Sequence, residues 1–176
     1  MRFDEFVARE HIEVRPADRF VGFSVGVELP PEWEQVDAKN GLRVWVWASD
    51  PRRKDFCGNA VLNLYRVQAV VEPSVLFAML CEQQRQSVPN SRELLSDLAA
   101  ATEGPGAAGT LVLQIDHVVG MIECATRSRI ITVEHQTLVA ELTVTALHDS
   151  PLDRSQIGLS VVVDHASLCS DSSPPG

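Results

Sequence analysis

The pattern Gly-x-Ser-x-Gly, at residues 22–26, is the first feature of the chain that could carry catalysis. In serine hydrolases this pattern places the serine on a sharp turn from a strand into a helix, and an acid and a histidine follow later in the chain. Here Pro30 and Pro31 come shortly after the motif, and no helical pattern separates them from it. The alternating apolar residues predict that Ser24 lies within a strand. A serine esterase using Ser24 is therefore the least favoured function.

Arg127 and Arg129 are spaced so that they share one face of a predicted strand. Two guanidinium groups on one face could bind an anionic ligand, because each can donate paired hydrogen bonds to a carboxylate or phosphate. If the last two β-rich segments form a hairpin, Glu141 or Glu123 can instead pair with these arginines across strands. Cross-strand pairing is the favoured interpretation, and both arginines are kept as candidate ligand-binding residues.

Trp45 and Trp47 form the second pair of candidate ligand-binding residues. They share one face of a strand predicted over residues 42–48, while Val44 and Val46 occupy the other face. Both faces of this strand are therefore apolar. Either the sheet is covered on both sides, or the tryptophan face lines a groove that binds a ligand.

The histidines and cysteines are too dispersed to indicate a metal site. The five histidines fall in separate elements, and the four cysteines include no Cys-x-x-Cys pair. Four cysteines in 176 residues also favour free thiols over a disulfide scaffold. We expect no catalytic residues, no metal and no cofactor.

Composition limits the partners of the chain. Its 176 residues are 45% hydrophobic, and 24 acidic against 15 basic residues give a formal net charge of −9. Binding to nucleic acid or to an anionic membrane surface needs an excess of Lys and Arg, so we expect neither. No apolar segment approaches the roughly 20 residues that span a bilayer.

The two ends bear on localisation and domain organisation. Residues 1–10 are charged and lack the apolar segment of a secretory signal peptide, and no cysteine near the start could carry a lipid. We therefore expect a cytoplasmic protein, with leaderless export to the cell envelope or outside as the alternative. Residues 169–176 are small and polar, which predicts a disordered tail after a single domain over residues 1–168.

Apolar periodicity predicts the elements that must position these residues. Helical spacing occurs near the N-terminus and after Pro73, and alternation in three segments of the first half indicates strands. Residues 93–102 fit a helix or a strand. Three long β-rich segments follow, and Ser150 and Pro151 then suggest the cap and first turn of a final helix. The predicted helices cover residues 3–11, 73–86 and 150–163, and the predicted strands cover 21–29, 42–48, 60–67, 110–119, 121–133 and 136–147.

These elements predict an α+β fold in which helices flank a mainly antiparallel sheet. Two N-terminal stretches also resemble the mycobacterial LpqN-type lipoprotein family. Residues 3–13 look like its short leading helix and a following Asn-x-Ile-x-Glu-like step, and residues 27–34 are similar to its strand end with prolines, an acid and a tryptophan. With the order of the later elements, the resemblance spans about residues 3–165.

The resemblance implies a PsbP-like α/β sandwich. It also implies a protein that is not an enzyme, in a family whose members are often tethered to the cell envelope through an acylated cysteine that this sequence lacks. Our first hypothesis is a non-enzymatic binding or adaptor domain that uses one face or edge of its sheet for a protein partner. The alternative is a carrier of an amphipathic or lipid ligand in an apolar groove near Trp45 and Trp47.

Overall fold

An antiparallel sheet of eight strands runs through the centre of the computed structural model, which describes residues 1–164. Seven strands follow one another in the order β3-β4-β5-β9-β8-β7-β6, and β1 pairs with the last residues of β5. The elements are α1 (Phe3–Arg9), β1 (Val14–Pro16), β2 (Phe23–Glu28), β3 (Trp33–Lys39), β4 (Leu42–Trp47), β5 (Asn59–Val67), α2 (Pro73–Ser87), β6 (Ser91–Ala100), β7 (Ala107–His117), β8 (Gly120–Val133), β9 (Gln136–Leu147), the 3₁₀ turn η1 (Arg154–Gln156) and β10 (Gly158–Val163).

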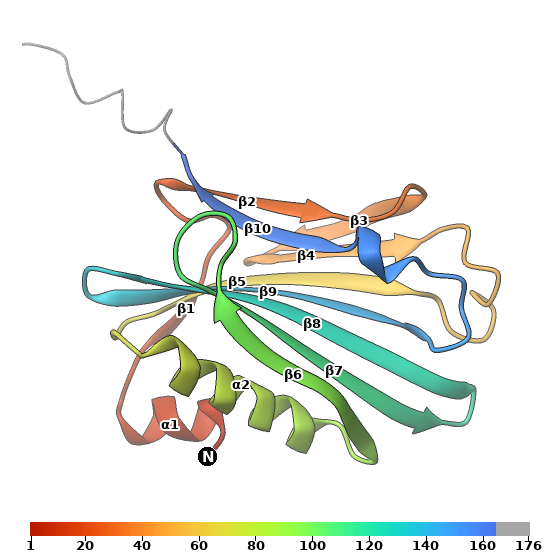
Figure 1. The fold of residues 1–176 in the computed structure, drawn as a ribbon, viewed down its shortest axis with the longest axis horizontal. Coiled ribbons are helices and arrows are strands. Elements are labelled where there is room, and N and C mark those ends of the chain that lie inside the picture. Colours follow the sequence, from red (N-terminus) through yellow and green to blue (C-terminus); the bar gives the residue numbers. More distant parts are fainter. Residues whose placement is uncertain (165–176) are drawn as a thin grey trace, which may run out of the picture.

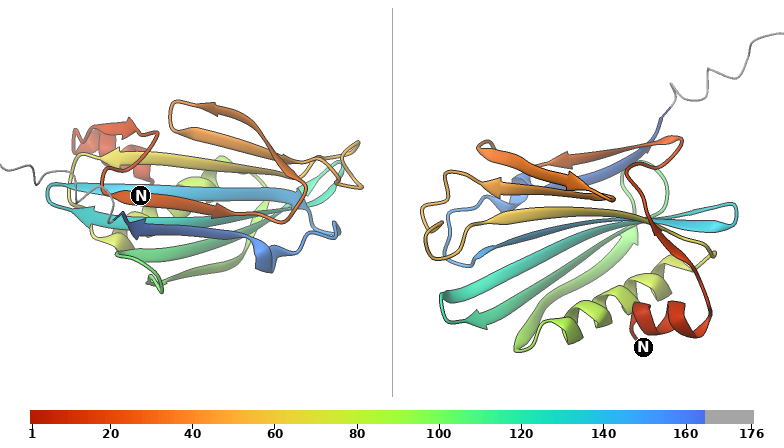
Figure 2. Two further views of the ribbon diagram at one scale, coloured as in Figure 1. Left: turned by 90° about the horizontal axis from the view of Figure 1, so that it is seen from above. Right: turned by 180° about the vertical axis from the view of Figure 1, so that it is seen from behind.

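Two different layers cover the faces of this sheet (Figures 1 and 2). The helices α1 and α2 lie on one face, and the antiparallel pair of β2 and β10 lies over the other. The predicted α+β class with a mainly antiparallel sheet is confirmed. Helices occupy one side only among the described residues, because a small second sheet takes the place of a helical layer on the other.

Strand β9 shows why the sheet needs both covers. Leu138 and Leu142, which are 3% and 0% exposed, point toward the β2–β10 layer. Val139, also 0% exposed, points the other way into the core beneath the helices. Because side chains alternate along a strand, each face of the sheet carries its own apolar core.

Helix α2 begins as the sequence predicts. Pro73 occupies its first turn, and the Glu72 carboxylate accepts a hydrogen bond of 3.0 Å from the backbone N–H of Val75. The helix packs Phe77 against β7 at Gly109, where a Cβ atom would lie 2.4 Å from the Phe77 ring. The absence of a side chain at Gly109 is therefore what lets the helix approach the sheet.

The ambiguous segment at residues 93–102 belongs to a strand. Its residues form most of β6, the outer strand beside β7, with a register shift between Glu93 and Leu95. Leu98 packs toward the core beneath the helices, whereas Leu94 and Leu95 are 45% and 48% exposed. The leucine spacing that suggests a helix thus arises from a bulged strand with leucines on both sides.

The final helix predicted over residues 150–163 is wrong. Asp153 caps only the short turn η1, and the chain then extends as β10 along β2. Val161 is fully buried in this pairing. Three consecutive valines favour the strand, since β-branched side chains lose less freedom there than in a helix. The Ser150 hydroxyl is buried without a hydrogen-bond partner among the described residues instead of capping a helix.

The predicted tail at residues 169–176, and the end of the predicted domain at 168, lie outside the described residues. In the described part of the chain, no helix has the length and apolar character needed to cross a bilayer.

Candidate functional site

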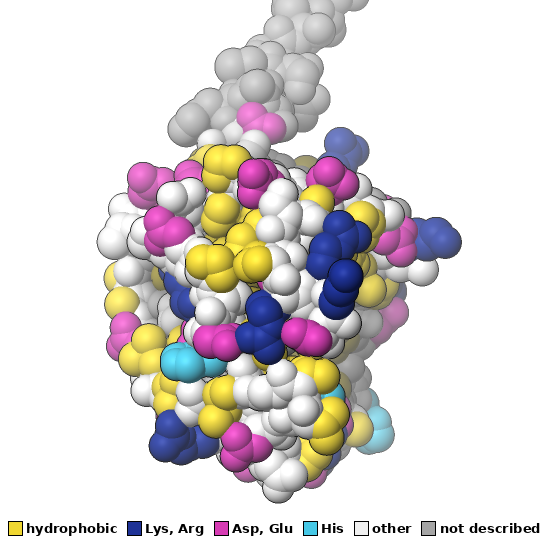
Figure 3. Space-filling view, turned by 90° about the vertical axis from the view of Figure 1, so that its right-hand side faces the viewer, with side chains coloured by type: hydrophobic (Ala, Val, Ile, Leu, Met, Phe, Trp, Pro, Cys, Tyr) yellow, Lys and Arg dark blue, Asp and Glu magenta, His cyan; other side chains and the backbone are white. Residues whose placement is uncertain are grey.

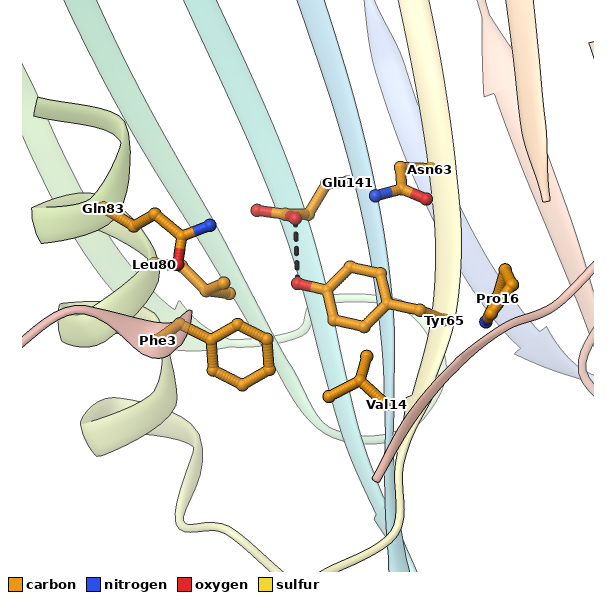
Figure 4. A pocket seen from close by; sticks show the side chains of 8 residues that line it. All are labelled: Phe3, Val14, Pro16, Asn63, Tyr65, Leu80, Gln83 and Glu141. Carbon is orange, nitrogen blue, oxygen red and sulfur yellow. Dashed lines mark hydrogen bonds between the residues drawn. The ribbon is translucent and has the colours of Figure 1, made fainter. Parts of the chain in front are cut away.

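A pocket of about 290 Å³ opens between the helices and the main sheet (Figure 4). Five elements contribute to its wall. The lining side chains are Phe3 from α1, Val14 and Pro16 from β1, Asn63 and Tyr65 from β5, Leu80 and Gln83 from α2, and Glu141 from β9.

Strand register brings the polar lining residues together. Asn63 lies directly opposite Glu141 in the β5–β9 pair, and Tyr65 lies opposite Val139. Tyr65 and Glu141 are therefore diagonal neighbours on one face of the sheet, within reach of a long side chain. The same alternation that buries Val139 beneath the helices turns Asn63, Tyr65 and Glu141 toward the pocket.

The Tyr65 hydroxyl donates a hydrogen bond of 2.9 Å to Oε2 of Glu141. Burial raises the pKa of the Tyr65 phenol well above its usual value, and the negative charge of Glu141 adds to the rise. Burial also raises the pKa of the Glu141 carboxyl, while the hydrogen bond from Tyr65 opposes this rise. No Lys, Arg or His is among the eight residues that line the pocket in the described structure.

Helix α1 closes one side of the pocket and is tied to α2 beside it. The backbone N–H of Asp4 donates a hydrogen bond of 2.8 Å to the Gln83 side-chain oxygen. The Phe3 ring lies 6.0 Å from the Tyr65 ring, centroid to centroid, at an angle of 40°. Figure 4 shows the amides of Gln83 and Asn63 on either side of the Glu141 carboxyl. The pocket thus combines aromatic walls with a carboxyl, a hydroxyl and two amides.

The structure places Trp45 and Trp47 away from this pocket, on the face of β4 turned toward the β2–β10 layer. Trp47 is 8% exposed and stacks on Trp33, with centroids 6.2 Å apart and planes 3° from parallel. Trp45 is half-buried against the same core. The edge of Trp47 also borders a second pocket, of about 330 Å³, beside Pro31 and Leu152. Most of the tryptophan face of β4 is therefore covered, which is the first of the two interpretations of the sequence.

Arg127 and Arg129 share one face of β8, as predicted, opposite Leu142 and Ala140 of β9. Arg129 is 4% exposed, and burial lowers the pKa of its guanidinium. Its Nη2 donates to the backbone carbonyl oxygens of Glu103, Pro105 and Val161, at 2.8, 3.0 and 3.3 Å. Arg129 therefore fastens the loop before β7, and strand β10, to the main sheet.

The cross-strand ion pairs expected for these two arginines are wrong. Glu141 lies opposite Ser128 and points to the other face of the sheet. Glu123 instead forms an ion pair with Arg154, and its carboxylate lies 3.1 Å from Nδ1 of His148. The partners of Arg129 are backbone carbonyl oxygens and not carboxylates, and the sequence alone does not indicate them.

Ser24 is the second residue of β2, paired with Val162 of β10, and its side chain is exposed. The strand continues from Ser24 to Glu28, so Ser24 does not occupy the strand-to-helix turn on which a hydrolase nucleophile depends. Over residues 1–164, no three His, Cys, Asp or Glu side chains gather in a way that could hold a metal ion.

Charges of both signs alternate on the end of the molecule shown in Figure 3, where basic side chains lie among acidic and hydrophobic ones. In the loop between β4 and β5, Arg52 pairs with both Asp55 and Asp149, at 3.0 and 2.7 Å. The described atoms of this end therefore do not form the continuous basic surface that phosphate backbones require.

The pocket is not predicted from the sequence, because its residues come from elements that lie far apart in the chain. The sequence indicates Glu141 only as a possible cross-strand partner for an arginine. One signal was present: Asn63, Tyr65 and Glu141 are polar side chains within strands whose neighbours are strongly apolar. What the sequence does not state is that β5 and β9 lie side by side.

The fold is similar to that of LpqN of Mycobacterium tuberculosis, whose crystal structure is described as that of a protein involved in cell envelope biogenesis. The two structures superpose with a TM-score of 0.67 over 85% of this chain and 87% of LpqN, at 18% sequence identity. No protein-family model matches the sequence, and no curated protein matches it. The comparison therefore establishes an LpqN-like fold.

Proposed function

We propose that this chain is a non-enzymatic binding domain that holds a small amphipathic ligand in the pocket lined by Tyr65 and Glu141. The mixed lining of the pocket carries the proposal. Phe3 and Leu80 supply apolar walls, and the carboxyl of Glu141 supplies a polar end that could orient a ligand. Binding sites for small molecules combine these two features.

The side chains in the pocket favour binding over catalysis. A nucleophilic mechanism needs a hydroxyl, thiol or amine next to a base that can activate it. Here the phenol and the carboxyl bind each other, and the raised pKa of Tyr65 keeps the phenol protonated. The other six lining residues are apolar or carry amides.

The size of the pocket favours a small ligand over a lipid. At about 290 Å³ it lies at the lower end of the roughly 300–1,000 Å³ that is usual for drug-sized ligands. The groove near Trp45 and Trp47, which the lipid-carrier hypothesis requires, is mostly filled by the packing of Trp47 against the β2–β10 layer. A short chain with one polar end suits the space better.

The LpqN-like fold and the two N-terminal stretches support a further part of this proposal, that the chain is a distant LpqN-type protein. In that case the protein would bind its ligand at the cell envelope. Fractionation of the host cells tests this part separately: the protein should be found with the envelope or outside the cell, and recovery only from the cytoplasm would contradict it.

A fragment screen by ¹H–¹⁵N NMR tests the binding proposal. Short amphipathic amines, alcohols and acids are added to the whole chain, and we expect saturable shifts in the amide signals of Asn63, Tyr65 and Gln83. Gln83→Trp should fill the rim of the pocket and abolish these shifts. Gln86→Trp, the same change one turn further along α2 at an exposed position, is the matched control and should leave them intact.

Shifts scattered over the surface, or equal binding by both tryptophan variants, would contradict the proposal. The ¹⁵N spectrum of each variant also reports whether it is folded, so loss of binding is counted only for a folded protein.

A further inference from the structure

We infer that this pocket selects a primary alkylammonium group, with its nitrogen against the Glu141 carboxylate and its alkyl chain between Phe3 and Leu80. The inference rests on the proposed function and deepens it, since it names the chemistry of the ligand.

The charge of the pocket is the first argument. Glu141 is the only acid among the lining residues, and no basic side chain accompanies it there. Within residues 1–164, Glu141 forms no ion pair, and its hydrogen bond from Tyr65 engages one of its two carboxylate oxygens. A carboxylate that is half-buried without a cation is stabilised by a ligand that supplies one.

The number of acceptors is the second argument. An ammonium group has three N–H donors and no acceptor. Around Glu141 the pocket offers two acceptors, the second carboxylate oxygen and the hydroxyl oxygen of Tyr65. Figure 4 shows the Glu141 carboxyl and the Tyr65 hydroxyl bonded to each other, between the amides of Gln83 and Asn63. These two acceptors can take two of the three N–H groups of a primary ammonium.

The walls of the pocket are the third argument. The Phe3 and Tyr65 rings stand 6.0 Å apart, and aromatic faces attract cations. Val14 and Leu80 add apolar surface for a short chain. An anionic ligand would meet the Glu141 charge in a pocket without a basic group, and a neutral alcohol would gain a hydrogen bond without an ion pair.

Three probes of equal chain length test the inference: hexylammonium, hexanol and hexanoate, titrated into the whole chain and followed by ¹H–¹⁵N NMR. At about pH 8 a simple alkylamine is charged, because its pKa is near that of lysine, about 10.4. We expect hexylammonium to bind about tenfold more tightly than hexanol, and hexanoate to bind least. Hexanol or hexanoate binding as well as hexylammonium would overturn the inference while leaving the pocket proposal intact. Binding of none of the three would remove both.

Glu141→Gln tests the role of the carboxylate and keeps a side chain of the same size that can accept from Tyr65. Hexylammonium should lose about tenfold in affinity, while hexanol changes by less than about twofold. Asp116→Asn removes an equal charge from an exposed strand end and should leave both affinities unchanged. An unaltered preference for hexylammonium in Glu141→Gln would overturn the inference.

The probe comparison on the wild-type chain stands whether or not the variant folds. Nα-acetyl-lysine methylamide, which carries the same ammonium group on a peptide unit, distinguishes the two sources of this chemistry. Binding equal to that of hexylammonium would assign the group to a lysine side chain, and weaker binding would assign it to a free amine.

Discussion

The hydroxyl of Tyr65 and the carboxylate of Glu141 meet at 2.9 Å although 76 residues separate them in the chain. The β5–β9 pairing brings them into diagonal register, on the face of the sheet on which the two helices lie. The pocket is therefore lined by one acid, Glu141, and by no basic side chain, so a bound cation would complement its charge.

Glu141→Gln should make stability less dependent on pH. Burial raises the pKa of Glu141 in the folded state above its ordinary value of 4.5, so the folded chain holds this proton more tightly than the unfolded chain. The contribution of Glu141 to stability is therefore full below pH 4.5 and is lost as the pH rises through the folded pKa. Urea unfolding from about pH 4 to about pH 8 measures this.

The unfolding free energy of the variant should increase relative to that of the wild type as the pH rises. If the unfolding free energy of the variant minus that of the wild type stays constant, or increases toward low pH, Glu141 does not have a raised pKa in the folded protein.

Arg129→Met should loosen the contact between the loop before β7 and strand β10. The change removes the hydrogen bonds of a charged donor to three backbone carbonyl oxygens, and we expect a loss of about 2–3 kcal/mol in unfolding free energy. Amide hydrogen exchange should speed up around Glu103 and Val161.

Arg127→Met is the matched control, on the same strand and face but less deeply buried, and should cost no more than about 0.5 kcal/mol. Equal losses in the two variants would argue that general packing, and not the carbonyl contacts, explains the role of Arg129.

Gly109→Ala should destabilise the contact of α2 with the sheet. The added methyl would lie 2.4 Å from the Phe77 ring, and such overpacking costs about 1–3 kcal/mol. Thermal unfolding measures the loss. Phe77→Leu in the same chain makes room for the methyl, so the double variant should be more stable than the sum of the two single changes predicts. Simple additivity would contradict this explanation.

Trp33→Ala and Trp33→Phe should differ strongly. Alanine removes the ring that stacks on Trp47, and we expect a loss of about 3 kcal/mol. Phenylalanine keeps an aromatic ring and removes an indole N–H that is buried without a hydrogen-bond partner among the described residues. Its cost should be below about 1 kcal/mol, and urea unfolding compares the two. Equal losses would show that the stack contributes little.

Local sequence signals were sufficient for most strands and both helices. The alternation of Leu138 and Leu142 with threonines predicted β9, and Pro73 marked the beginning of α2. The helix predicted after Pro151 was wrong because its real partner, the edge of β2, is more than a hundred residues away in the chain. The segment forms a strand because the edge of β2 is available to pair with it, and the sequence of the segment alone does not show this partner.

The same limit explains the candidate site. Trp45 and Trp47 were conspicuous by type, and packing against the β2–β10 layer uses most of their surface. Asn63 and Glu141 are less conspicuous by type, yet the register of β5 with β9 places them directly opposite each other. Non-local pairing assembled the pocket, so its residues could be identified only after the order of strands was known.

A crystal structure of the whole chain grown with hexylammonium tests the central claim most directly. The account predicts the ammonium nitrogen at about 3 Å from a Glu141 carboxylate oxygen, with the alkyl chain between Phe3 and Leu80. An empty pocket at a saturating concentration, or hexylammonium bound elsewhere on the protein, would contradict it.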